Sequence, residues 1–257
     1  MGRQHRAASG HERAVPERSW VLSGSTGLIL LTSVVIFASV HGAGTLLYLA
    51  FRFPAELDPV AEAISYYAYV DGARVRFTVA LLEMALAGAA LTLALLKAGA
   101  LRRTAALVLM NSWCAGVVLV ALFPTDDDPR ILSVSGVIHQ VAGASLFVTL
   151  PLAVLLALRE PSGAVRARGV ATTLRRAAIA TLALALAYLT ARLPDIAPGW
   201  PLVSAIGNVA VGGLLQRALF AGELVLLLVL AGWLFAVTRS GAPLDGDGAG
   251  DPAGRDG

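Results

Sequence analysis

Charged residues are scarce in this chain, and their scarcity excludes an ordinary soluble domain. Asp, Glu, Lys and Arg make up 14% of the 257 residues, whereas soluble domains contain roughly 25%. The charges gather near the two ends and in short connectors, which leaves long apolar runs between them. Runs of about 20 apolar residues match a hydrocarbon layer of roughly 30 Å at a rise of about 1.5 Å per residue. The sequence therefore predicts an integral membrane protein that is surrounded by a lipid bilayer.

Cysteine, lysine and several catalytic motifs are also rare or missing. Cys114 is the single cysteine, so an intrachain disulfide is excluded, and its apolar surroundings are typical of a small buried hydrophobe. Lys97 is the single lysine, and the excess of Arg, Ala, Gly and Val is typical of a GC-rich bacterial genome. The sequence has no phosphate-binding glycine loop and no Gly-x-Ser-x-Gly motif. The basic residues flank apolar runs instead of forming one patch, so we expect no nucleic-acid partner.

The sequence contains few residues that could form a metal or cofactor site. A zinc site needs three or four His, Cys or carboxylate ligands. Only His41 and His139 lie in the apolar runs, and neither belongs to a His-x-x-x-His pair. We therefore expect no metal and no other cofactor.

Six apolar runs predict six transmembrane helices, and hence an all-α, polytopic membrane helix bundle. The predicted spans are residues 27–48, 77–96, 104–123, 134–158, 177–193 and 218–237. The first run is longer than a signal-peptide core and follows a hydrophilic segment, so we expect it to be retained. Residues 1–24 are then a polar tail, 25–238 the membrane domain and 239–257 a disordered tail rich in Gly, Asp and Pro.

The basic residues are distributed unevenly about these spans, and this distribution predicts the orientation. Six spans place both tails on one side, together with the connectors around Lys97 and Arg166, and this side carries 14 of the 20 Lys and Arg residues. The other side carries Arg52, Arg74, Arg76, Arg130, Arg192 and Arg217. We therefore expect both termini to be cytoplasmic and the chain to be a multi-pass protein of the cell membrane.

Three connectors are then expected on the outer side, at residues 52–76, 124–133 and 194–217. The first two are acidic, and their acidic residues are Glu56, Asp58, Glu62, Asp71, Asp126, Asp127 and Asp128. The third contains an apolar stretch, residues 202–215, that is too short to span alone. This stretch is an interfacial helix, a re-entrant helix or an extension of the last span.

Four ionisable side chains fall inside the predicted spans, namely His41, Glu83, His139 and Glu223. Each such group costs about 2.5–3.5 kcal/mol in the hydrocarbon layer and so needs a partner or a water-filled cavity. In the predicted orientation all four lie in the outer half or near the middle. Glu83 is about 10 Å inside its span, and Glu223 is nearer the surface, within reach of interfacial water.

Helical spacing places three of these groups on stripes of small or polar residues. The stripes are Ala80, Glu83, Ala87, Ala90 and Ala94; Gly136, His139, Gln140 and Gly143; and Ala38, His41, Gly42 and Thr45. Small stripes mark helix contacts, so we expect these faces to meet protein and to enclose a polar pocket beneath the acidic connectors. The alternative is that these groups only fix helix packing, through hydrogen bonds that contribute about 0.6 kcal/mol.

Arg217 precedes the last predicted span, and the sequence leaves its partner open. Its side chain either extends outward to the interface or pairs with Glu83 or with an aspartate of the second outer connector. A charge pair of the second kind would hold the outer pocket together.

Four local motifs resemble a known family. They occupy residues 59–67 (PVAEAISYY), 122–126 (LFPTD), 136–140 (GVIHQ) and 213–217 (GLLQR). In order and spacing they are similar to the I-S-x-Y, F-P-x-D, G-x-x-H and G-L-x-x-R segments of a bacterial membrane family, Domain of Unknown Function 998, over about residues 25–238. The resemblance points to Ser65, Tyr66, Asp126, His139 and Arg217. Tyr66 stands where an acidic residue is common in the family, and the family name implies no activity.

Three functions remain open. The first is an enzyme, such as a hydrolase of a lipid-type substrate, in which Ser65, Asp126, Glu83 and His139 converge and histidine acts as a general base beside a carboxylate. The second is a small transporter or proton-linked permease that uses Glu83, His139 and Arg217. The third is a non-catalytic membrane component that binds a lipid, a small molecule or a partner protein.

Overall fold

Long helices account for the fold of the described residues, which are 24–127, 133–159, 168–193 and 211–240 of the computed structural model. The elements are α1 (Gly24–Arg52), the 3₁₀ helix η1 (Ile64–Tyr69), α2 (Arg74–Lys97), α3 (Thr104–Leu122), α4 (Val134–Ala157), α5 (Arg168–Ala191) and α8 (Gly212–Ser240). Six of these helices are long and apolar enough to cross a membrane. The prediction of an all-α, six-span membrane protein is confirmed.

Two helices begin earlier than their apolar runs predicted. α5 begins at Arg168 instead of residue 177, and α8 begins at Gly212 instead of residue 218. Apolarity marks only the part of a helix that lies in lipid, whereas the backbone hydrogen-bond pattern continues through polar residues with adequate helix propensity. In the stretch 202–215, residues 212–215 form the first turn of α8, and residues 202–210 lie outside the described residues.

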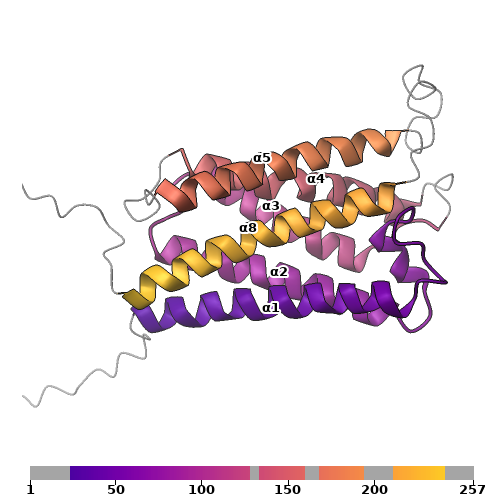
Figure 1. Ribbon diagram of the computed structural model, residues 1–257, viewed down its shortest axis with the longest axis horizontal. Coiled ribbons are helices and arrows are strands. Elements are labelled where there is room, and N and C mark those ends of the chain that lie inside the picture. Colours follow the sequence, from indigo (N-terminus) through magenta and orange to yellow (C-terminus); the bar gives the residue numbers. More distant parts are fainter. Residues whose placement is uncertain (1–23, 128–132, 160–167, 194–210, 241–257) are drawn as a thin grey trace, which may run out of the picture.

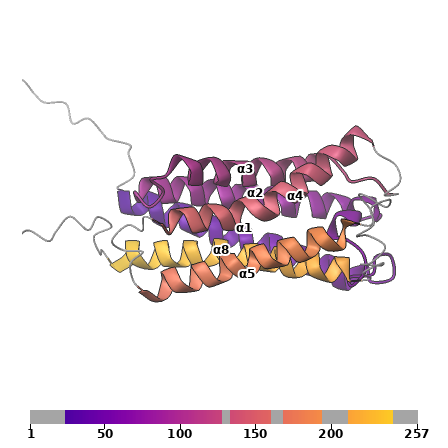
Figure 2. The same cartoon turned by 90° about the horizontal axis from the view of Figure 1, so that it is seen from above.

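The helices form a closed ring in which each packs beside the next: α1, α2, α3, α4, α5, α8 and again α1. Figures 1 and 2 show that all six run along one common axis. At one end of the bundle α1 begins and α8 finishes, and we call this the terminal end (Figure 1). At the other end α1, α3 and α5 finish and η1 lies over the bundle, and we call this the η1 end (Figure 1).

Small residues bring neighbouring helices close together, as their spacing predicted. A Cβ atom added to Gly42 of α1 would lie 3.0 Å from the backbone oxygen of Ala80 in α2. At Gly88 of α2 an added Cβ would lie 2.4 Å from the ring of Trp113 in α3. Contacts of this kind replace the hydrophobic effect as the source of helix association in lipid.

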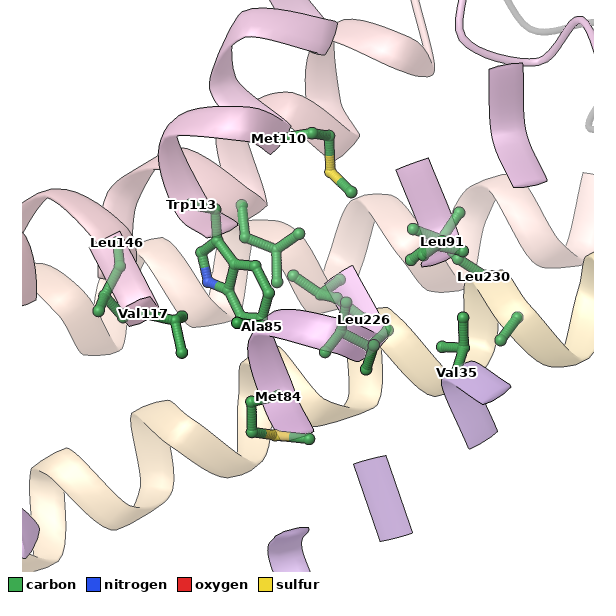
Figure 3. Packing of buried hydrophobic residues seen from close by; sticks show 14 of the residues in the cluster. Val35, Met84, Ala85, Leu91, Met110, Trp113, Val117, Leu146, Leu226 and Leu230 are labelled. Atoms are coloured by element: carbon green, nitrogen blue, oxygen red, sulfur yellow. The ribbon is translucent and has the colours of Figure 1, made fainter. Parts of the chain in front are cut away.

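The interior is filled by large apolar side chains around Trp113, which is 1% exposed. Figure 3 shows the indole of Trp113 directed from α3 toward α2, with Ala85 beside it and Val117 and Leu146 to one side. Large apolar side chains also lie on the outside of the bundle, for example Phe37 and Phe51, which are 71% and 78% exposed. Exposed apolar side chains on spanning helices are suited to contact with lipid chains.

Candidate functional site

An inner cavity of about 60 Å³ lies within the η1 half of the bundle, between α1, η1, α2, α3, α4 and α8. Its wall is mostly apolar and aromatic, but it includes the polar side chains of Ser65, His139, Gln216 and Glu223. A single water needs roughly 10–15 Å³ of such space. The inner cavity therefore has room for a few water molecules or for a small ligand group.

Two further cavities lie between the inner cavity and the η1 end. The middle cavity, of about 70 Å³, shares Ser65, His139, Gly143, Phe147 and Gln216 with the inner cavity. The outer cavity, of about 650 Å³, shares Ala63, Tyr66 and Arg192 with the middle cavity. Because neighbouring cavities share walls, the three form a series that leads from the connectors to Glu223.

Asp126 caps the start of α4 and does not line any of the three cavities. Its carboxylate accepts hydrogen bonds from the backbone N–H of Ser133 at 3.2 Å and from the Ser133 hydroxyl, while Ser133 Oγ accepts from the N–H of Gly136 at 2.9 Å. A carboxylate at a helix N-terminus also interacts favourably with the helix dipole. A Cβ atom added to Gly136 would lie 1.8 Å from Asp126 Oδ2, so this position requires glycine.

His139, one turn further along α4, is held by the end of α3. Its Nδ1 lies 2.7 Å from the carbonyl oxygen of Phe123. A carbonyl oxygen only accepts hydrogen bonds, so Nδ1 carries the proton and, in the neutral ring, Nε2 carries the lone pair. Pro124, which follows Phe123, has no N–H group and interrupts the helical hydrogen bonds at this point. The F-P-x-D and G-x-x-H motifs therefore form one structural unit, the α3–α4 unit.

The expected convergence of Asp126 and His139 is only partly present. Both lie at the η1 end, and a Cβ atom at Gly136 would contact Asp126, yet the partner of the imidazole is a backbone carbonyl rather than the carboxylate. Asp126 instead satisfies Ser133. The arrangement is that of a helix cap next to an oriented histidine, and not that of a carboxylate–histidine pair.

A second unit fixes η1 to the start of α8, and we call it the η1–α8 unit. The Nη1 atom of Arg217 donates to the carbonyl oxygens of Pro59 at 2.7 Å, Glu62 at 2.8 Å and Gly213 at 3.2 Å. The N–H of Ile64 donates to Gln216 Oε1 at 2.7 Å. At Gly213 an added Cβ would lie 2.2 Å from the carbonyl oxygen of Glu62, so the connector lies directly against α8.

Of the alternatives that the sequence left open for Arg217, an ion pair with Glu83, Asp126 or Asp127 is not found, and Asp128 lies outside the described residues. Carbonyl groups in the irregular first connector have no helical N–H partner, and a guanidinium group with its several donors can satisfy more than one of them. The motifs at residues 59–67 and 213–217 meet in this contact. Pro59 and Glu62 supply carbonyl groups to Arg217, and Ile64 of the first motif donates its N–H to Gln216 of the second.

The anchoring of η1 determines where Ser65 and Tyr66 lie. Ser65 is 8% exposed and lines the inner and middle cavities together with His139. Tyr66 lines the middle and outer cavities. Of the predicted candidates, the structure thus brings together Ser65 and His139, with Tyr66 nearer the η1 end.

Tyr69 joins the two units and was not among the predicted candidates. Its hydroxyl group donates to the carbonyl oxygen of Thr125, beside Asp126. Partial burial raises the pKa of Tyr69 above its ordinary value, and the neighbouring carboxylates of Asp127 and Asp126 raise it further. The only signal in the sequence is the cluster of tyrosines at residues 66–69, which does not show where each hydroxyl group points.

Glu223 is buried and lies well inside α8, which corrects the expectation that it is near the end of its helix. It is 2% exposed and comes 11 residues after Gly212, the start of α8, or about 16 Å along the axis. The expectation was wrong because it counted from residue 218. Trp113 Nε1 donates to Glu223 Oε2 at 3.2 Å, and Oε1 has no hydrogen-bond partner among the described residues. Trp113 and Gln216 were also missed as members of the site.

Glu83 and His41 form a separate pair outside the cavity series. His41 Nδ1 lies 2.8 Å from Glu83 Oε2, and the two side chains are 55% and 23% exposed. The expectation that both face a shared pocket with His139 was wrong. The small stripe of α2 does meet α1, but Glu83 lies at the edge of that contact, where His41 reaches it from the exposed side of α1.

The chemistry available at the site is hydrogen bonding within an apolar wall. Among the described residues, no three His, Cys, Asp or Glu side chains are grouped so that they could hold a metal ion. His139 supplies an acceptor, Ser65 a hydroxyl group, Gln216 an amide N–H₂ group and Glu223 a carboxyl oxygen. Such a set can bind and orient a small polar group.

Comparison with known proteins identifies the family. The family model described as "Protein of unknown function (DUF998)" matches residues 35–233. No curated protein and no solved structure matched the chain. The match covers α2 to α5 in full, most of α1 and of α8, and all four motifs that build the two units. The chain is therefore a member of the DUF998 family.

Proposed function

We propose that this membrane protein binds a small amphiphilic, lipid-type ligand in the series of cavities at its η1 end. The observation that carries the proposal is the polar group of Ser65, His139, Gln216 and Glu223 in the otherwise apolar wall of an intramembrane cavity. Burying an ionisable group inside a membrane costs free energy, so such a group is by default a candidate for contact with a ligand or a partner. The apolar and aromatic remainder of the wall matches the body of an amphiphile.

Gly143 offers a direct test of the cavity. It lines the inner and middle cavities, and a Cβ atom added there meets nothing within 4 Å. Gly143→Leu therefore fills the cavities without a clash at Cβ. We expect the protein, reconstituted in nanodiscs, to bind short-chain amphiphiles by calorimetry and this variant to lose the binding.

The matched control is Gly232→Leu in α8, where an added Cβ also meets nothing within 4 Å and the residue lines none of the three cavities. It should bind as the unaltered protein does. Native mass spectrometry of the purified protein separates the two sources of such a ligand, because a co-purified mass identifies a membrane lipid and its absence favours a soluble amphiphile. Equal binding by both leucine variants would refute the proposed site.

The orientation forms part of the proposal. The excess of Lys and Arg on the side of the termini supports a cytoplasmic terminal end and a ligand that enters from outside the cytoplasmic membrane of a bacterial cell. In a Cys114→Ala background, Asp127→Cys places a thiol beside the outer cavity. A membrane-impermeant maleimide should label this thiol in intact cells, and labelling only after lysis would reverse the orientation.

Hydrolysis of the bound ligand is the second candidate. It is favoured by one observation, the presence of Ser65 and of a histidine with a fixed Nδ1 partner in the same cavity walls. In that reaction Nε2 takes the proton of Ser65 Oγ as the oxygen attacks an ester carbonyl, and it gives this proton to the departing alcohol as the ester C–O bond breaks. Water, deprotonated by the same Nε2, then hydrolyses the acyl-serine and restores Ser65. Ser65→Ala and His139→Ala should then abolish ester cleavage, while Ser65→Ala retains binding. Retained cleavage in both variants would exclude this role.

A further inference from the structure

Glu223 is the innermost polar group of the cavity series, and one of its oxygens is unused. Oε2 accepts from Trp113, whereas Oε1 has no partner among the described residues although the side chain is 2% exposed. A buried acceptor without a donor is costly, and a buried carboxyl group more so. Glu223 lines the inner cavity, and a turn of its carboxyl group, whose Oε1 is itself shielded, would present that oxygen to a donor in the cavity.

The wall around Glu223 offers no competing positive charge. Among the described residues no Arg or Lys lines the inner cavity, and His139 presents Nε2 as an acceptor in its neutral form. Four aromatic rings, those of Phe77, Trp113, Phe147 and Phe220, line the same cavity. The faces of aromatic rings attract cations, most strongly where water is excluded. A carboxyl group that is surrounded by aromatic rings is therefore suited to binding a cation.

The charged residues that line the outer cavity also favour a positively charged ligand. Within the described part of the chain, the outer cavity is lined by the acidic residues Glu56, Glu62, Asp71 and Asp127 and by one basic residue, Arg192. A cleft lined mainly by one sign of charge raises the local concentration of ligands of the opposite sign. A metal ion is a poor occupant of the inner cavity, because a structural or catalytic site needs three or more ligands and the described residues group no three His, Cys, Asp or Glu side chains in this way.

We infer that the ligand of the inner cavity is a small organic cation, a protonated aliphatic amine. Its ammonium group donates to Glu223 Oε1 and its apolar body contacts the aromatic wall. This inference rests on the proposed binding function and adds the chemical class of the ligand. A primary amine suits the site because it has N–H groups to donate, which a quaternary ammonium group lacks.

The test compares three probes of equal chain length, hexylamine, hexanol and hexanoate, by calorimetry on the full chain in nanodiscs at neutral pH. Hexylamine should bind at least about tenfold more tightly than hexanol, as one charge-assisted hydrogen bond predicts, and hexanoate should bind most weakly. Glu223→Gln should remove the preference for the amine while leaving the affinity for hexanol within about twofold. Glu83→Gln, which removes an acid of α2 outside the cavities, should change neither affinity.

The outcomes of this experiment distinguish the inference about the amine from the proposed binding function. Equal affinities for amine and alcohol, or equal effects of the two glutamine variants, would overturn the inference and leave the binding function standing. Binding of none of the three probes would overturn both. If Glu223→Gln does not accumulate, the exposed pair Glu56→Gln and Asp71→Asn provides the test. This double variant should slow the association of hexylamine at low salt but not that of hexanol, and an unchanged rate would count against the inference.

Discussion

The two halves of the bundle are built from the same six helices, yet they differ in how polar groups are used. In the η1 half the cavities are lined by Ser65, His139, Gln216 and Glu223. At the terminal end a cavity of about 30 Å³ is lined by apolar side chains such as Leu95 and Leu230, together with Trp233. Both halves reach close helix packing, so the polar groups of the η1 half are not needed for packing alone.

The difference is sharpest in the two tryptophans that line these cavities. The indole N–H of Trp113 donates to Glu223, whereas the indole N–H of Trp233 has no partner among the described residues. The two halves also differ in the carbonyl groups of their connectors. In the η1 half the irregular segments before η1 and after α3 turn carbonyl groups toward Arg217 and His139. The polar interior thus depends on two units that hold these segments in place.

The largest effect is expected from Arg217→Ala. It removes a charged donor from the carbonyl groups of Pro59 and Glu62, and each such hydrogen bond contributes about 1.5–3 kcal/mol. We therefore expect a loss of about 3 kcal/mol in stability, measured by thermal unfolding in detergent, together with loss of ligand binding. Arg76→Ala is the control, since exposed Arg76 bonds one carbonyl group, that of Gly72, and should cost far less. Similar losses of stability in both variants would show that the hydrogen bonds of Arg217 contribute no more to stability than the single exposed bond of Arg76.

The next effect concerns the α3–α4 unit. In Gly136→Ala the new methyl group would overlap the Asp126 carboxylate, so the cap of α4 must shift, at a cost of about 1–3 kcal/mol. Gly232→Ala, in the terminal half of α8, meets open space and should be neutral or slightly stabilising. The melting temperatures of the two alanine variants measure the contrast. A destabilised Gly232→Ala variant beside an unaffected Gly136→Ala variant would reverse the comparison between the halves.

A smaller effect is expected when each tryptophan loses its N–H group. Trp113→Phe leaves the Glu223 carboxyl group without its donor and should cost about 1–2 kcal/mol. Trp233→Phe removes a buried donor that has no partner among the described residues, so it should cost less and can even stabilise the protein. Both variants also lose ring volume, and the comparison between them cancels much of that loss. Equal destabilisation would mean that packing, and not the hydrogen bond, decides the role of Trp113.

Much of this architecture could be predicted from the sequence, because apolar runs report directly on lipid contact. The small stripes of α1 and α2 and the positions of Gly136 and His139 were also readable, since helical spacing places residues on one face. The depth of Glu223 was not readable, because it depends on a helix start at Gly212 that precedes the apolar run.

The partners of the polar groups depend on contacts between distant segments. Nothing near Arg217 in the sequence shows that the carbonyl groups of Pro59 and Glu62 will face it, more than 150 residues away. Nor does spacing along α2 distinguish a glutamate directed into the core from one at the edge of the α1 contact, where Glu83 meets His41. Local patterns thus predicted the helices and the motifs, whereas the hydrogen-bond network required the tertiary structure.

The smallest effect concerns the hydrogen bond by which Tyr69 joins the two units. Tyr69→Phe loses the bond to the Thr125 carbonyl, at a cost of about 1 kcal/mol or less at neutral pH. Tyrosine in the unfolded chain ionises near pH 10, and partial burial with Asp127 and Asp126 nearby raises the pKa of Tyr69 in the folded chain. The folded protein then holds the proton more tightly, so this contribution is complete below about pH 10 and is lost as pH rises through the folded pKa.

The difference in melting temperature between the unaltered protein and Tyr69→Phe should therefore be constant from neutral pH to about pH 10 and shrink only as the pH rises further, through the folded pKa. Tyr48→Phe, which alters a half-exposed tyrosine of α1, is the control for removal of a hydroxyl group elsewhere. A difference that stays constant while the absorbance of Tyr69 shows its ionisation would mean that the charge does not disturb the contact with Thr125. The two units would then be joined by the packing of η1 rather than by this hydroxyl group.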